Sequence, residues 1–168
     1  MPTEWETFYL MVGSSAVILI GLLFVVITLS SNMDAHRAVI GARIYMTPTV
    51  YHLGTVVLVS TVALMPGTPL YAMALAVAVP ALSGFVYAAL SLVRMFRNPP
   101  VPHWTDYVYY GVVPGLVHLW LTAAAWAFWQ EFEPAAHAVA AGLVALLLVG
   151  TRDAWDLATY LVTARADR

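Results

Sequence analysis

The segment "TRDAWDL", Thr151 to Leu157, places three charged side chains directly after a long apolar run. Arg152 and Asp156 are four residues apart, so they share one helix face and can form an ion pair there. Asp153 adds a second carboxylate within the same turn. Such a group can hold a proton or a cation, or it can mark the water-facing end of a membrane helix.

Two histidines share a local pattern, because the letters P-x-x-x-H-L occur twice and place His52 and His118 four residues after a proline. We interpret the repeat as a weak internal echo between two helices that run in the same direction. His118 falls about 18 Å along its helix, near the middle of a bilayer. A histidine there is either a neutral bridge between helices or a group that accepts protons or binds a ligand.

Two histidines on neighbouring helices are also the minimum needed to bind a haem b. A helix that starts at Thr47-Pro48 puts His52 only about 6 Å deep, roughly a dozen ångströms from the level of His118. That separation is too large for one iron, whereas a helix beginning near Ala38 would match the two levels. No cofactor is therefore predicted, and haem ligation by His52 and His118 stays an alternative.

Most other polar side chains lie near those ends of the predicted helices where the arginines also occur. We predict that they form a cytoplasm-facing ligand site or ion pathway, with His118 as its midplane gate and the arginine–aspartate group at its mouth. Each member also has a plain structural role; Asp106, for example, suits the first turn of a helix. The predicted set is Arg43, Thr47, Thr49, His52, Asp106, Tyr110, His118, Arg152, Asp153 and Asp156.

Several kinds of chemistry find no support in the sequence. The chain has no cysteine, which excludes disulfides, thiolate metal sites and cysteine nucleophiles. No HxxxH, HExxH, GxSxG, P-loop or GxGxxG pattern occurs, so neither a metal site nor a catalytic residue is predicted. A net charge of −2 gives no basic surface for nucleic acid. Enzymatic activity is not predicted, although a membrane enzyme with aspartate acid–base groups is left open.

The composition is that of a membrane protein. Hydrophobic residues make up 62% of the chain and charged residues 10%, with a mean hydropathy of +0.82, against about 25% charged residues in soluble domains. Several apolar runs have the roughly twenty residues needed to cross a bilayer. All seven cationic residues are arginines, and with abundant alanine and valine this indicates a bacterial, inner-membrane protein.

We predict an all-α integral membrane protein, a bundle of five transmembrane helices in a single domain that spans residues 1–168. Thr47-Pro48 and Thr68-Pro69 each combine an N-cap residue with a proline at the first helical position. The predicted spans are 7–30, 48–64, 69–93, 106–129 and 135–152, the last with a helical cytoplasmic extension to about 163. Whether the last helix continues past Gly150 is left open.

The arginines predict an orientation. Every arginine falls after the first span, after the third or at the C-terminus, and none falls on the other side. Because cytoplasmic loops are rich in arginine and lysine, the N-terminus is predicted outside and the C-terminus in the cytoplasm.

The last span carries small residues at Ala138 and Gly142, a spacing that lets helices approach closely. The same face continues to Arg152 and Asp156, whereas Leu143, Leu146 and Leu147 are expected to turn mostly elsewhere. The charged pair should therefore meet other helices or a neighbouring subunit. A bundle of five short helices has little room for an enclosed pathway, so a homo-oligomer is expected.

These features predict a small channel or transporter-like protein for a proton, an ion or a small solute. One alternative is a non-catalytic accessory or assembly subunit of a larger membrane complex, which the absence of a soluble domain would suit. A further alternative is a haem- or quinone-binding membrane protein. The lipid bilayer is the one partner that every alternative requires.

Overall fold

The computed structural model describes residues 5–29, 47–97 and 104–166, and these ranges contain five helices long and apolar enough to cross a membrane. No strand occurs within those ranges. The predicted all-helical class and the five long helices are thus confirmed, and the chain has the architecture of a multi-pass membrane protein. In chain order the elements are α1 (Glu6–Leu29), α3 (Thr47–Leu64), α4 (Leu70–Arg97), α5 (Trp104–Tyr107), the π-helix η3 (Val108–Val112), α6 (Val113–Trp129) and α7 (Ala135–Ala166).

The helix ends follow the sequence signals closely. Helix α3 begins at Thr47 with Pro48 in its first turn, as expected for a proline that has no N–H to donate. Helix α4 continues to Arg97, four residues beyond the predicted Val93. Helix α7 continues without interruption past Gly150 to Ala166, which settles the question that the sequence left open.

The fourth long helix contains a π turn that the sequence did not predict. The amide of Val113 donates to the carbonyl of Val108, five residues back, and Pro114 follows immediately. A proline removes one helical hydrogen bond because it has no N–H. The π turn therefore falls where Pro114 already interrupts the regular series of helical hydrogen bonds.

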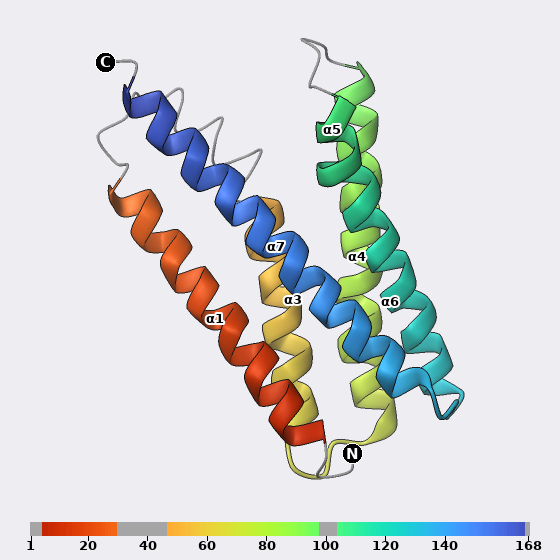
Figure 1. Cartoon of the computed structure of the whole chain (residues 1–168). Coiled ribbons are helices and arrows are strands. Elements are labelled where there is room, and N and C mark those ends of the chain that lie inside the picture. Colours follow the sequence, from red (N-terminus) through yellow and green to blue (C-terminus); the bar gives the residue numbers. More distant parts are fainter. Residues whose placement is uncertain (1–4, 30–46, 98–103, 167–168) are drawn as a thin grey trace.

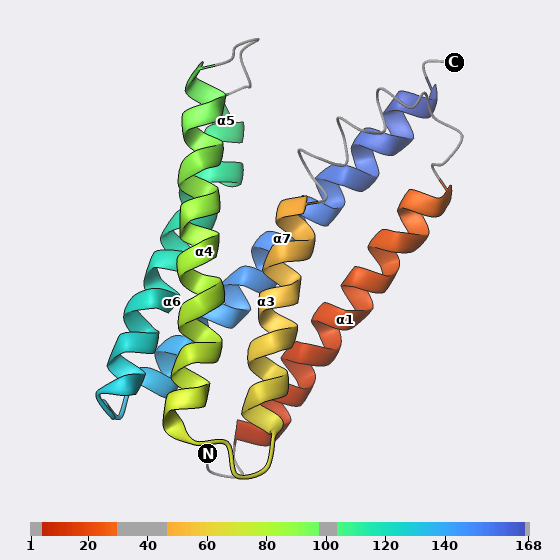
Figure 2. The same cartoon turned by 180° about the vertical axis from the view of Figure 1, so that it is seen from behind.

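The helices form a four-helix group with α1 on its outside. Helices α3 and α6 lie diagonally opposite each other, and each packs against both α4 and α7. Helix α1 packs mainly on α3 and also touches α7 (Figure 1). We call the end with the α1 start, the α3–α4 turn and the α6–α7 turn the N-terminal end, and the end with α5 and the last turns of α7 the C-terminal end (Figures 1 and 2).

Helix α3 is shorter than its neighbours, with 18 residues against 28 in α4 and 32 in α7. Its first turn lies nearer the middle of the bundle than the end of α4 or the end of α7 does (Figures 1 and 2). A residue close to the start of α3 is therefore already deep inside the bundle.

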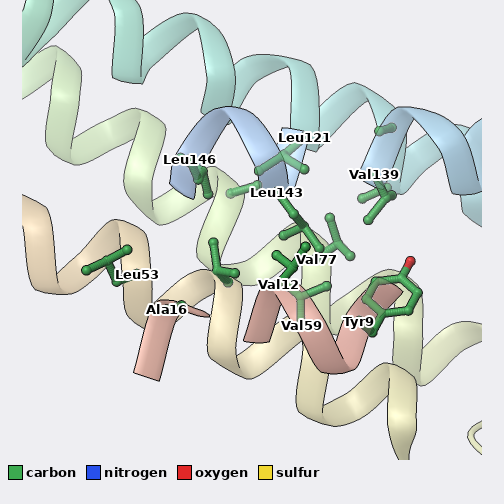
Figure 3. Close-up of a cluster of buried hydrophobic side chains, with 14 of the residues drawn as sticks. Tyr9, Val12, Ala16, Leu53, Val59, Val77, Leu121, Val139, Leu143 and Leu146 are labelled. Carbon is green, nitrogen blue, oxygen red and sulfur yellow. The ribbon is translucent and has the colours of Figure 1, made fainter. Parts of the chain in front are cut away.

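Aliphatic side chains fill the centre of the bundle (Figure 3). Leu53, Val56 and Val59 of α3 are completely buried. Leu143 and Leu146 of α7 are also completely buried, so the expectation that these leucines turn away from the packed side was wrong. The reason is that α7 packs on two sides at once, against α6 and against α3.

Small residues on α7 allow this double packing. A Cβ added to Gly142 would overlap Leu121 of α6, and one added to Gly150 would press on Leu53 of α3. Near the N-terminal end, the indole N–H of Trp120 donates to the carbonyl of Ala138 at 2.9 Å. The 138–142 face of α7 thus serves contacts within the chain.

Candidate functional site

A pair of hydrogen-bonded histidines lies inside the bundle. Nδ1 of His52 on α3 is 3.1 Å from Nε2 of His118 on α6. The side chains are 2% and 0% exposed, respectively. Nε2 of His52 and Nδ1 of His118 are buried too, and neither has a hydrogen-bond partner. The pair therefore joins two diagonally opposite helices and keeps one unsatisfied nitrogen on each ring.

The expected difference in depth between the two histidines was wrong. Helix α3 starts at Thr47, the start from which the depth of His52 was counted. The His52 ring nevertheless meets the His118 ring directly. The two spans do not start at the same level, because α3 begins well inside the bundle (Figure 2). A distance counted along each helix from its own first residue therefore does not give the relative depth of His52 and His118.

This arrangement does not fit a haem held between the two rings. The direct contact of Nδ1 and Nε2 at 3.1 Å leaves no space for an iron and its porphyrin between those nitrogens. In the described part of the chain, no cluster of three or more histidine, aspartate or glutamate side chains is arranged to hold a metal ion. The chemistry that the pair itself supports is hydrogen bonding and proton exchange.

Helix α4 provides the surface on which the pair rests. Gly84 lies directly beneath the ring of His118, and a Cβ there would overlap three ring atoms. The hydroxyl of Tyr51 donates to the carbonyl of Pro80 at 2.8 Å and lies 2.6 Å from the hydroxyl of Ser83. The Tyr51 ring packs edge-on against His118, with the ring centroids 5.8 Å apart. A tyrosine on α3 and a glycine on α4 thus fix the orientation of His118.

A second polar group lies nearer the C-terminal end, where α7 meets η3. The hydroxyl of Tyr110 donates to a carboxylate oxygen of Asp156 at 2.6 Å, and Nε of Arg152 is 3.8 Å from that same oxygen. The Arg152 guanidinium also covers the ring of Tyr109, 3.1 Å from its centroid. Arg152 and Asp156 thus face the fourth long helix, as the small-residue stripe predicted.

Asp153 points in a different direction from its two charged neighbours. Its side chain is 1% exposed, and its Oδ2 has no hydrogen-bond partner. Gly150, three residues earlier, contacts Leu53 next to His52. Asp153 lies about 4.5 Å further along α7 than Gly150, the residue that contacts Leu53. A buried carboxylate needs a proton or a polar partner.

The remaining predicted residues are spread around this region. Thr49 is completely buried and Thr47 is exposed, both in the first turn of α3. Asp106 belongs to α5, but its side chain lies outside the described part of the structure. Arg43 lies outside the described residues altogether. The predicted set therefore resolves into the histidine pair, the carboxylate Asp153, and the group of Tyr110, Arg152 and Asp156.

Sequence reasoning missed several residues that shape the site. Tyr51 and Gly84 contact His118, Ser83 is hydrogen-bonded to Tyr51, and Tyr109 lies beneath Arg152. Gly84 carried a signal, since a glycine inside a helix is costly unless another group approaches its backbone closely. Tyr51 directly precedes His52 and carried no signal, because its role depends on α4.

The arrangement supports proton chemistry within a mostly apolar interior. The histidine pair offers one donor and one acceptor between its two outer nitrogens, and Asp153 offers a buried carboxylate on α7, one turn beyond the residue that contacts Leu53. Since the same architecture carries many different activities, these groups rather than the fold have to support any assignment. Comparison of the chain with protein-family models, with curated proteins and with solved structures gave no match.

Proposed function

We propose that this chain is a small transporter-like protein of a bacterial inner membrane that carries protons across the bilayer along a gated path through the His52–His118 pair. The observation that carries the proposal is the direct contact of two buried histidines at 3.1 Å, with the outer nitrogen of each ring buried and unpaired. Ionisable groups are costly in a bilayer interior and mark proton pathways in pumps and transporters.

Each tautomer gives the histidine pair one end that accepts a proton and one end that donates a proton. If His52 carries its proton on Nδ1, it donates to Nε2 of His118, and His118 then carries its own proton on Nδ1. The pair therefore presents a bare acceptor at Nε2 of His52 and a donor at Nδ1 of His118. In the opposite tautomer the two ends exchange roles.

Proton transfer through the pair balances without any other reactant. A proton that binds Nε2 of His52 makes that ring an imidazolium. The proton on its Nδ1 then crosses to Nε2 of His118, and His118 releases the proton from its Nδ1. One proton enters and one leaves. Before the next transfer each ring has to move its remaining proton back to Nδ1, by reorientation or by exchange with water, because the reverse transfer would carry the proton back.

Asp153 is the group that we propose to exchange protons with the pair on the side of the C-terminal end. It is buried, one of its oxygens is unpaired, and it lies on α7 one turn beyond the residue that contacts Leu53. Arg152 and Asp156 lie on the next face of the same helix, partly exposed, and Tyr110 of η3 donates to Asp156. This group would form the polar mouth of the path at this end.

On the other side of the pair the path is closed by apolar side chains. Val56 and Val59 of α3 are fully buried beyond His52. The buried hydroxyl of Thr55 donates to the carbonyl of Tyr51 at 2.9 Å, so the next buried hydroxyl without a partner is that of Ser60. Ser60 lies eight residues beyond His52, about 12 Å along the helix, and its hydroxyl has no partner. A proton cannot cross this aliphatic layer without water or a rearrangement, which favours a gated carrier over an open channel.

The orientation and assembly belong to the same proposal. The arginines support an N-terminus outside and a C-terminus in the cytoplasm, which would place Asp153 on the cytoplasmic side of the histidines. Gly142 contacts α6 of the same chain, so the small-residue face gives no support for an interface between subunits. The proposed homo-oligomer rests instead on the small size of a five-helix bundle. Mass photometry of the full chain in nanodiscs measures the number of subunits.

Proton flux in liposomes tests the proposed function. The full chain is reconstituted around a pH-sensitive dye, and a potassium gradient with valinomycin drives proton entry. We expect flux above that of protein-free liposomes, and a loss of at least tenfold in His118→Gln, because glutamine can hydrogen-bond but cannot relay a proton.

His137→Gln is the matched control, since His137 is an exposed histidine whose ring packs edge-on against Trp5 at 4.9 Å. This control should conduct as the parent does. Folded protein without flux, or equal loss of flux in His118→Gln and His137→Gln, would overturn the proposal. The accessory-subunit alternative would gain support if the chain purified from its native membrane only with other subunits.

A further inference from the structure

A cavity of about 600 Å³ opens at the N-terminal end of the bundle, far from the polar mouth at the C-terminal end. This volume is within the range of about 300–1,000 Å³ that is typical of small-molecule sites. Its wall combines the first turns of α1, the end of α3, the α3–α4 turn, the end of α6 and the start of α7. The residues used below are Trp5, Glu6, Tyr9, Leu70, Met73 and Phe128.

Most of the cavity wall is apolar. Met73 is buried and belongs to the central aliphatic cluster, and Phe128 packs against that cluster. With Leu70 they give the cavity a floor and a side that suit a hydrocarbon or aromatic body. An apolar wall of this kind supplies most of the binding free energy of a small ligand through burial of its surface.

One hydroxyl in the wall has no partner within the protein. The side chain of Tyr9 is 1% exposed, and its hydroxyl oxygen is buried without a hydrogen bond. That oxygen points away from Val12 and Val59 (Figure 3). A buried hydroxyl is costly unless a partner satisfies it, so a ligand with an N–H or O–H group gains a hydrogen bond there once a small side-chain movement uncovers the oxygen.

The charges around the cavity favour a cation. Among the described residues of its lining, Glu6 is the one that carries a charge. Arg94 and Arg97 belong to the last turn of α4, and Arg152 contacts Tyr109 of η3, so these arginines are away from the cavity. A carboxylate in the lining attracts a cation to the cavity.

The aromatic rings add a specific attraction for a cation. Trp5 and Tyr9 line the cavity together, with ring centroids 6.2 Å apart. The faces of tryptophan and tyrosine attract an ammonium group, and tryptophan does so most strongly. One carboxylate and two such rings at one end of an apolar cavity therefore match a single positive charge.

We propose that this cavity binds an amphiphilic organic cation, an ammonium group carried on an apolar body. The ammonium lies near Glu6 and the Trp5 ring and donates an N–H to the Tyr9 oxygen, while the body lies among Leu70, Met73 and Phe128. The proposal does not depend on the proton path, because the cavity shares none of the residues of that path.

Binding of 4-phenylbutylammonium to the purified full chain tests the site, with 4-phenylbutyrate as a probe of nearly the same body and opposite charge. Isothermal titration in detergent, corrected for micelles without protein, should show saturable binding of the cation only. We expect affinity to fall about fivefold in Glu6→Gln, about tenfold in Trp5→Leu and about tenfold in Tyr9→Phe.

Each variant has a matched control outside the cavity lining. Glu133→Gln, Trp129→Leu and Tyr71→Phe remove the same groups from exposed positions and should bind as the parent does. Equal binding of the phenylbutyrate anion would show an apolar pocket without charge selection and would overturn the proposal. So would the absence of saturable cation binding, or equal losses in the variants and their controls. None of these outcomes bears on proton flux, so the two proposals fail separately.

Discussion

Gly84 of α4 lies face to face with the ring of His118 of α6, so closely that a single added carbon would overlap the ring. Because glycine has no Cβ, the backbone of α4 can approach the imidazole directly. The contact holds the ring at the position where its Nε2 meets His52 at 3.1 Å. The histidine pair thus depends on a glycine that belongs to neither of the two helices it joins.

The substitution Gly84→Ala should separate the rings of His52 and His118. The added methyl group must displace either the His118 ring or α4, and overpacking of this kind costs about 1–3 kcal/mol. We expect a lower unfolding temperature and the loss of the nitrogen–nitrogen coupling between His52 and His118 in ¹⁵N NMR. Gly54→Ala is the control, since a Cβ there meets nothing within 4 Å. An unchanged coupling in Gly84→Ala would contradict the described packing.

The histidine pair should show strong energetic coupling. Removing one ring leaves a buried nitrogen of the other unsatisfied, at a cost of about 1–3 kcal/mol beyond the lost packing. The double variant His52→Ala/His118→Ala should therefore be more stable than the sum of the two single losses predicts. Unfolding of the full chain in mixed detergent measures the cycle. His137→Ala combined with His118→Ala should be additive, and a cycle without coupling for His52 and His118 would refute the hydrogen bond.

The hydrogen bond between Tyr110 and Asp156 should stabilise the contact of η3 with α7. The bond is 2.6 Å long and only partly buried, so Tyr110→Phe should cost about 1 kcal/mol. Tyr109→Phe offers a close comparison, because it keeps the ring that Arg152 covers and should leave stability within about 0.5 kcal/mol of the parent. Chemical unfolding of the two variants measures both effects, and equal losses would contradict this assignment.

The α6–α7 turn should be improved by a glycine. Glu131 has a φ of 57°, and its amide donates to Phe128 while that of Phe132 donates to Ala127. This is the Schellman pattern, in which the left-handed position usually holds glycine. Glu131→Gly should stabilise the protein by roughly 0.5–1 kcal/mol, since glycine relieves the left-handed strain. Thermal unfolding checks the sign, and Glu133→Gly should bring no gain.

The sequence by itself determined the number of helices and most of their ends. Apolar runs of the right length, each opened by a threonine–proline or another breaker, give five helices without any tertiary information. It also singled out His52, His118 and the 152–156 charges, because polar groups are rare in such a chain. The direction of Arg152 and Asp156 followed from the 138–142 stripe, since a regular helix carries a face forward at steps of three or four residues.

Only the tertiary structure decided which of these residues meet. Helix periodicity gives each side chain a face and a distance from the start of its own helix, but not the level at which that helix begins in the bundle. His52 and His118, 66 positions apart, become neighbours because α3 starts deep between α4 and α7 (Figure 1). The burial of Leu143 and Leu146 likewise depends on α7 touching two helices at once. Relative helix levels and double contacts arise from packing between distant segments, which local sequence patterns do not encode.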